Sequence, residues 1–471
     1  MTVMPSRIWP KLLDSAWLSM GYASFNKLPE GISFAGGRYA SDVTFLKDVT
    51  YIDKDGKRHT EQEIFDAIFS TISSARKLIV LDLFLFNNFQ SVQREESRAL
   101  SLELTRLLIQ QKALFPAMQI ILITDPINTI YGGTTSDYFD QLQDKGIRVV
   151  LTELDKLRDS NPIYSFFWRL LIRPFRISPG GWFSSPFDGH KVPLRSYLKL
   201  LNFKANHRKS IIADDGQTWT GIVTTGNPHD ASSAHRNVAV KFNGLAVRDL
   251  YISELAALSL SGVPIPDGEV NPIAVESDII LQVVTEKQIK IAVIDEIESM
   301  QDGDRIDLIL FYLGDQEVIK ALKNAAARGV DIRLVLDPNK DAFGLRKIGI
   351  PNRPVAYDLI DTGIKIRWAY THGEQCHSKL MLCSSANGNT LILGSANFTR
   401  RNLDDFNLET DVVISGPEDA TVFQDSHALF ERIWNNEPGR TYSIDYDHYR
   451  DEGRFRYWLY RLMELTGIST F

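Results

Sequence analysis

The stretch NHRKSIIADD, residues 206–215, has a counterpart in CHSKLMLCSS, residues 376–385. In both stretches a His stands two residues before a Lys, and the Lys opens an apolar run typical of a buried strand. Residues two apart in a strand point to the same face, so each His shares a face with its Lys. The sequence therefore predicts the same polar pair at the starts of two different strands.

The segments around the two pairs repeat as well. KLIVLDLFLF, QIILITDP and GIRVVL in the first half correspond to RIDLILFYL, DIRLVLDP and GIKIRW in the second, with helical patterns between them. Strands that alternate with helices indicate an α/β fold with a largely parallel sheet. We expect two similar halves, residues 1–262 and 279–471, related by pseudo-twofold symmetry. The Pro-, Gly- and acid-rich segment 263–278 is the predicted linker.

Composition narrows the class of protein. The chain has 471 residues, is 44% hydrophobic and carries a net charge of −7, which argues against a general nucleic-acid binder. Its two cysteines, Cys376 and Cys383, cannot form a disulfide framework and indicate reduced thiols. No apolar run reaches the roughly 20 residues of a membrane span, and the N-terminus does not resemble a secretory signal. These features predict a cytoplasmic protein that can attach to a membrane surface.

Each half also supplies an Asn at the same spacing after its His. The predicted catalytic residues are His207, Lys209 and Asn227 in the first half and His377, Lys379 and Asn397 in the second. Two Lys and two Asn side chains can hold a phosphate and stabilise its negatively charged transition state. One imidazole can attack phosphorus, while the other protonates the leaving alcohol and later deprotonates water or an alcohol. Because the lysines supply positive charge, we expect no metal and no cofactor.

The double His-x-Lys, with Gly-Ser-x-Asn after the second copy, resembles the phospholipase D superfamily. NHRKSIIAD followed by HRNVAVKFNGLAV is similar to bacterial cardiolipin synthase-like members. The resemblance implies two α/β/α sandwich halves of the phospholipase D type, with the active site completed within one chain. It also implies supporting roles for Asp214 and Ser395. The chain departs from the family pattern at Ser384, where the second copy would have Asp, and at Thr224 and Thr225, where the first would have Gly-Ser.

The resemblance further implies an acid about 30 residues after the His that orients an imidazole. Glu409 fits this position in the second half, and Asn237 stands at the matching position of the first. An amide holds an imidazole but stabilises its charged form less well than a carboxylate. By family analogy we expect His207 to be the nucleophile and His377 the acid and base. Sequence symmetry leaves this assignment open.

Aromatic and basic side chains gather in two peripheral segments. An insert at about residues 160–190 includes FFWRLLIRPFR and contains no acid between residues 161 and 187. The C-terminal segment predicts an amphipathic helix with a stripe at Phe455, Trp458, Leu459, Leu462 and Leu465. A similar segment holds Trp9 and Trp17 at the N-terminus. These segments suit an anionic membrane surface, although packing against the protein body or stacking on nucleotide bases would use the same residues.

Together these features predict a phospholipase D-type phosphodiesterase or phosphatidyltransferase. It would act on membrane phospholipids through a covalent phosphohistidine, in the manner of cardiolipin synthase, with water or an alcohol as acceptor. The alternatives are a nuclease-like phosphodiesterase on single-stranded nucleic acid and a binding protein with a degraded site. The complete His-Lys-Asn sets argue against the degraded site, and the net charge of −7 argues against nucleic acid. The headgroup, the acceptor and the oligomeric state stay open.

Overall fold

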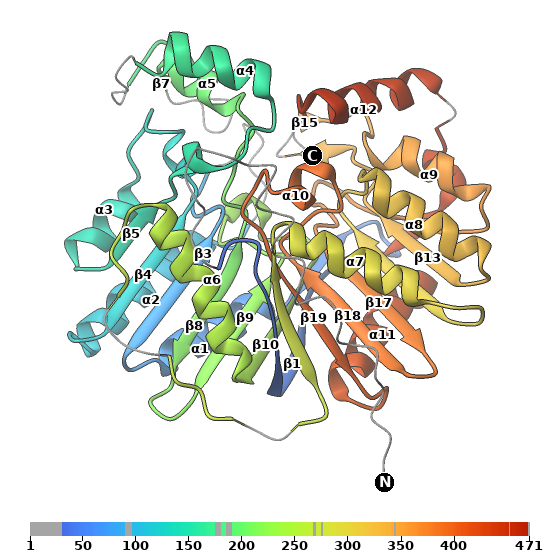
Figure 1. Ribbon diagram of the computed structural model, residues 1–471, viewed down its shortest axis with the longest axis horizontal. Helices are drawn as coiled ribbons and strands as arrows, with labels where there is room; N and C mark the ends of the chain where they lie inside the picture. The colour runs from blue at the N-terminus through green and yellow to red at the C-terminus, as the bar shows by residue number, and fades with distance from the viewer. Residues whose placement is uncertain are drawn as a thin grey trace, which may run out of the picture.

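The structure is a computed structural model that describes residues 31–89, 97–174, 180–184, 191–266, 270–274, 277–342, 345–451 and 453–469. The N-terminal segment with Trp9 and Trp17 lies outside these residues. Figure 1 shows two α/β halves side by side. Seventeen strands of the described chain join in a single sheet, and helices cover it on both sides.

The order of strands is the same in both halves. The first half pairs its strands in the order β5 (Arg148–Leu151), β4 (Gln119–Thr124), β3 (Leu78–Leu83), β8 (Lys209–Asp214), β9 (Trp219–Thr224), β10 (Asn237–Gly244) and β1 (Ala35–Asp53). The second pairs β16 (Lys365–Ala369), β13 (Asp331–Leu336), β12 (Arg305–Leu310), β17 (Lys379–Ser385), β18 (Gly388–Gly394), β19 (Thr410–Gly416) and β11 (Ile280–Thr285). Strand β1 pairs with both β10 and β11, so it connects the two series. The predicted α/β class is confirmed, whereas the pseudo-twofold relation and the domain boundaries stay predictions.

The sheet is mixed, and the expectation of a largely parallel sheet is wrong. Among the strands that the structure describes, only β5, β4 and β3 in the first half, and β16, β13 and β12 in the second, run parallel to one another. The strand that opens with the Lys of each His-x-Lys motif is antiparallel to its neighbours. The reason is the connection: β8 to β9 and β17 to β18 are joined by hairpins, which only antiparallel strands allow.

The described residues form three apolar cores between these layers. Helices α1 (Ile64–Ser74), α2 (Leu100–Leu114) and α3 (Asp137–Asp144) cover the outer face of the first half, and α7 (Lys287–Ser299), α8 (Gln316–Ala327) and α9 (Asn352–Ile360) cover that of the second. The third core joins the inner faces of both halves, with α6 (Ala246–Leu260) and α11 (Thr421–Asn435) packed against it. Val240 of β10 and Val412 of β19 both belong to this shared core. The two halves are therefore held together by apolar packing as well as by β1.

Two peripheral segments stand at the edge where the parallel strands end (Figure 1). The insert between β5 and β8 contains α4 (Pro162–Phe167), the π-helix η4 (Trp168–Ile172), β6 (Phe183–Ser184), β7 (Lys191–Val192) and α5 (Leu194–Leu200). The C-terminal helix α12 (Arg454–Thr466) lies over the second half. None of the described helices is long and apolar enough to cross a membrane.

Candidate active site

The two His-x-Lys motifs start on the same edge of the sheet, and each is hydrogen bonded to the other half. The backbone N–H of His207, just before β8, donates to the Leu408 carbonyl at 2.8 Å. The backbone N–H of His377, just before β17, donates to the Arg236 carbonyl at 3.0 Å. Each histidine is thus held at the junction between the halves, where residues from both can meet.

Matched aspartates hold the residue before each histidine. The Asp125 carboxylate, at the end of β4, accepts the Asn206 N–H at 2.7 Å. The Asp337 carboxylate, at the end of β13, accepts the Cys376 N–H at 2.8 Å. Asp125 also caps the short 3-10 helix η2 (Pro126–Thr129). Both aspartates therefore fix the backbone of a motif rather than face the reacting groups.

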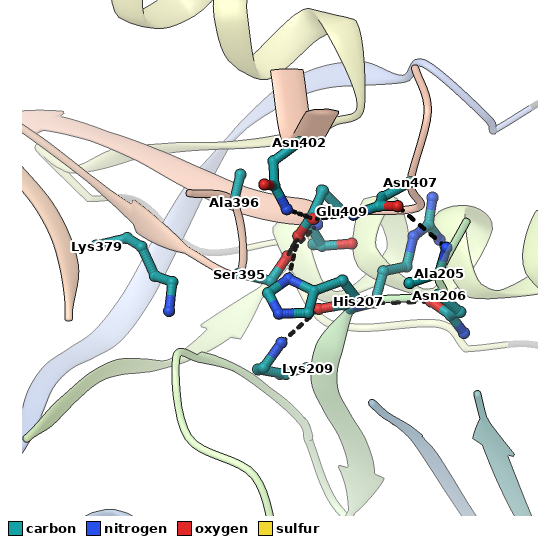
Figure 2. Close-up of polar contacts among 12 residues, drawn as sticks. Ala205, Asn206, His207, Lys209, Lys379, Ser395, Ala396, Asn402, Asn407 and Glu409 are labelled. Atoms are coloured by element: carbon teal, nitrogen blue, oxygen red, sulfur yellow. Dashed lines mark hydrogen bonds and ion pairs between the residues drawn. The ribbon is translucent and has the colours of Figure 1, made fainter. Parts of the chain in front are cut away.

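Glu409 orients the His207 ring. The two side chains meet through His207 Nδ1 and Glu409 Oε2, 2.9 Å apart (Figure 2). The same carboxylate accepts hydrogen bonds from the Ser395 hydroxyl at 2.5 Å and from the side-chain amides of Asn402 and Asn407. Glu409 is fully buried. Because every one of these neighbours donates, the site is built to hold a carboxylate anion at this position.

Asn237 takes the corresponding place beside His377. Its Oδ1 lies 3.2 Å from His377 Nδ1 and accepts the Thr225 hydroxyl at 3.0 Å. Lys379 Nζ lies 3.0 Å from His377 Nε2, and a lysine ammonium only donates. This network assigns the ring hydrogen of neutral His377 to Nδ1, where Asn237 accepts it. The Thr225 hydroxyl is engaged with Asn237, just as the Ser395 hydroxyl is engaged with Glu409.

The orienting contacts cross between the halves. Glu409 belongs to the second half and holds the histidine of the first, while Asn237 belongs to the first half and holds the histidine of the second. Asn237 opens β10 and Glu409 directly precedes β19, but their spacing along the chain does not show which ring each one reaches. The inequality expected from the sequence is present: one imidazole faces a carboxylate and the other an amide.

Two phenylalanines missed by the sequence analysis line the site. The Phe84 ring packs edge-on against His207, with centroids 4.7 Å apart, and Lys209 Nζ lies 5.2 Å from its centroid. Phe311 takes the same place beside His377, at 5.0 Å, and beneath Lys379 Nζ, at 5.3 Å. The sequence does contain a signal for these two residues, because LFLF (83–86) and LFYL (310–313) begin at the last residues of the matched strands β3 and β12. Each ring excludes water from one face of a His-Lys pair and attracts the ammonium.

The remaining predicted residues occupy two different environments. Asn227 and Asn397 are nearly fully buried just beyond the ends of β9 and β18, where the Asn227 Oδ1 accepts the Leu85 N–H at 3.2 Å. The Asn397 Oδ1 finds no donor among the described residues. Asp214 lies at the far end of β8 and accepts backbone N–H groups of Lys77 and Leu78 at 2.8 and 2.9 Å. It therefore fixes the start of β3, away from the histidines.

Comparison with known proteins identifies the second half. Residues 293–434 match the family described as cardiolipin synthase, PLD-like domain. This chain carries a phospholipase D-like domain. The matched range contains His377, Lys379, Ser395, Asn397 and Glu409. The resemblance of the chain to the phospholipase D superfamily is thereby confirmed.

Two solved structures were compared with this chain. The phosphatidylserine synthase of Haemophilus influenzae Rd KW20 superposes with a TM-score of 0.57 at 10% identity, covering 92% of this chain and 95% of that one. The Salmonella typhimurium phospholipase D family member Nuc has a TM-score of 0.27 at 21% identity, covering 35% of this chain and 99% of that one. No curated protein sequence matches this chain. The first comparison shows a shared fold over nearly the whole chain.

Burial gives the candidate site a preference for binding an anion. Desolvation lowers the pKa of His207 to about 4 and that of Lys209 to about 7. Burial, reinforced by repulsion from neighbouring cationic groups, holds the pKa values of His377 and Lys379 well below their usual range. Lys209, Lys379 and His377 would regain positive charge beside an anion, so a bound phosphodiester would relieve the repulsion among them.

Glu409 carries the negative charge that partly balances these cationic groups. Burial alone would raise its pKa, but His207, Lys209 and the Ser395 hydroxyl outweigh burial and lower the pKa to about 2. The carboxylate is therefore ionised at neutral pH while the His207 ring beside it is neutral. Neutral imidazole is the form that can act as a nucleophile. Among the described residues, no group of three His, Cys, Asp or Glu side chains could hold a metal ion.

Proposed function

We propose that this protein is a phospholipase D-type phosphodiesterase or phosphatidyltransferase that acts on membrane phospholipids, as a cardiolipin synthase does, through a covalent phosphohistidine. The observation that carries the proposal is the crossed pair of contacts, His207 to Glu409 and His377 to Asn237. These contacts bring both His-Lys pairs to one junction in inequivalent states. The family match at residues 293–434 supports a lipid substrate.

The first step uses the inequality of the two histidines. Nε2 of neutral His207 attacks phosphorus, and the N–P bond forms as the P–O bond to the leaving alcohol breaks. The Nδ1–H of His207 donates to Glu409, which stabilises the positive charge that grows on the ring. His377, protonated once the phosphodiester is bound, gives its proton to the leaving oxygen. Its amide partner Asn237 stabilises that proton less than a carboxylate would, so the proton transfers readily.

The second step reverses these roles. Neutral His377 removes a proton from water or an alcohol, whose oxygen attacks phosphorus as the N–P bond to His207 breaks. Lys209, Lys379 and the amides of Asn227 and Asn397 bind the non-bridging oxygens in both steps. Water as acceptor gives phosphatidic acid, and an alcohol gives a new phosphodiester. One chain supplies every group, and the proposed reaction needs no metal.

Labelled phosphatidylglycerol, incubated with and without a short-chain alcohol, tests the proposal. We expect phosphatidic acid in water, a phosphatidyl alcohol when the alcohol is present, and undiminished turnover in EDTA. His207→Ala and His377→Ala should each abolish turnover, while His448→Ala serves as the control because His448 is exposed and its ring packs on Tyr449. Cleavage of single-stranded DNA without turnover of the lipid would replace the proposal with the nuclease alternative.

A further inference from the structure

Two faces of the molecule expose large apolar side chains. The insert face, residues 162–172, exposes between 50 and 76% of Ile163, Phe166, Phe167, Leu170 and Leu171. The α12 face exposes between 53 and 77% of Phe455, Trp458, Leu462, Leu465 and Ile468. Clusters of this kind on a folded protein mark a surface that another molecule covers.

Neither face is needed to hold its own segment on the protein. The insert is anchored from its other side by Trp168, which is only 3% exposed, and by the Ser165 hydroxyl, which donates to Asn202 at 3.0 Å. Helix α12 is anchored by Tyr460, which is fully buried and donates its hydroxyl to the Gly314 carbonyl at 2.5 Å. Leu459, expected on the exposed stripe, packs against the core instead. The side chains that anchor these segments to the protein are therefore different from the exposed ones.

The two faces meet beside the active site. Gly467 at the end of α12 approaches Ser160 at the start of the insert so closely that a Cβ on Gly467 would overlap the Ser160 carbonyl. Both residues line one small cavity with Arg401 of α10 (Arg400–Leu403), which follows closely after Asn397. Figure 1 shows α4 and α12 at the edge of the sheet where the parallel strands end. This is the edge at which His207 and His377 stand.

Positive charge borders both faces, against the acidic balance of the chain. Arg169 and Arg173 on the insert and Arg456 on α12 expose 44, 55 and 40% of their side chains, and each also pairs with one aspartate, at 2.8, 3.6 and 2.6 Å. No acid occurs between residues 160 and 174, although the whole chain carries a net charge of −7. Arginines around an apolar face are the arrangement that binds an anionic bilayer surface.

We propose that the insert face and the α12 face form one docking surface for an anionic phospholipid bilayer, which places the active-site edge against the leaflet. The identity of the substrate rests on the proposed function. The docking surface itself is argued from the exposed residues alone. Six of the ten exposed side chains are aliphatic, and aliphatic groups enter the acyl region but do not stack on bases. The bilayer is therefore favoured over nucleic acid.

Vesicle flotation tests the docking surface. The probes are vesicles of phosphatidylglycerol with phosphatidylcholine and vesicles of phosphatidylcholine alone. We expect Phe166→Ser/Leu170→Ser and Trp458→Ser/Leu462→Ser each to weaken binding to the anionic vesicles by about tenfold or more, because each pair removes two inserted apolar groups. Leu114→Ser is the matched control: Leu114 is 60% exposed but ends α2, at the opposite edge of the sheet.

A soluble substrate separates docking from chemistry. On a short-chain phosphatidylglycerol below its critical micelle concentration, both double variants should keep their kcat/KM while losing activity on vesicles. Circular dichroism confirms that each variant is folded. Equal vesicle binding by the double variants and the unchanged protein would overturn the docking surface, as would an equal loss in Leu114→Ser. Failure of the unchanged protein on the soluble substrate would instead overturn the proposed function and leave the flotation result to decide the docking surface.

Discussion

Replacing Glu409 with Gln tests the crossed geometry most directly, because it removes a charge and almost no volume. Four side chains donate to this carboxylate, among them His207, Ser395 and Asn402. A Gln amide can accept from only one of its two ends. Its NH₂ would face the Asn402 amide, which cannot turn over without losing the hydrogen bond it accepts from Thr399 at 2.8 Å. We therefore expect two losses: the negative charge that faces His207 is removed, and the new side-chain NH₂ at position 409 is forced against the NH₂ of Asn402.

The distance in the structure sets the size of the effect. At 2.9 Å, a positive His207 ring and the Glu409 carboxylate attract each other by about 6 kcal/mol at an effective dielectric constant of about 20. A neutral hydrogen bond keeps roughly half the strength of a charge-assisted one. The transition state for phosphohistidine formation should therefore lose about 3 kcal/mol, which lowers kcat/KM about a hundredfold.

The assay measures kcat/KM against pH on a soluble phosphodiester, with activity expressed per folded molecule. Glu409 raises the pKa of the His207 ring, so its removal should also move the acidic limb of the profile to lower pH. Glu254→Gln is the matched control, since Glu254 is equally buried but faces the Ser210 hydroxyl, at 2.7 Å, and Arg208, at 3.6 Å, rather than a histidine. If Glu409→Gln kept kcat/KM within about threefold, or if Glu254→Gln lost as much, the reasoning would be refuted.

Three further changes separate chemistry from structure. His377→Asn should let a phosphatidyl adduct on His207 accumulate when the substrate has a good leaving group, detected by intact mass; an absence of adduct at full substrate cleavage would contradict this. Asp214→Asn should lower the free energy of unfolding in urea by about 1–3 kcal/mol without changing kcat per folded molecule, because its partners are backbone N–H groups. Burial lowers the pKa of His235 to about 3, below its unfolded value of about 6.5. The unfolded chain therefore binds the proton first as the pH falls. His235→Asn should accordingly flatten the pH dependence of unfolding between pH 6.5 and 3 by up to about 1.4 kcal/mol per pH unit, and an unchanged slope would exclude this linkage.

Much of the site could be predicted from the sequence because strand periodicity and duplication act locally. The alternation of side chains places His207 beside Lys209 and His377 beside Lys379, and the repeat of strands around them indicates an α/β fold. The mixed sheet was not predicted, since apolar runs of parallel and antiparallel buried strands look alike. Phe84 and Phe311 were missed for a similar reason: each reads as one more apolar residue at the end of a strand.

What the sequence determined by itself is the inventory of candidate groups: two His-Lys-Asn sets, one carboxylate and one amide, and two apolar-basic segments. Only the tertiary structure decided how they are paired. Glu409 reaches the histidine of the other half, and the insert meets α12 at Ser160 and Gly467, because the inner faces of the halves pack into one core. Local sequence sets which face of a strand a side chain occupies. The packing of segments that are distant in the sequence sets which other side chain it contacts.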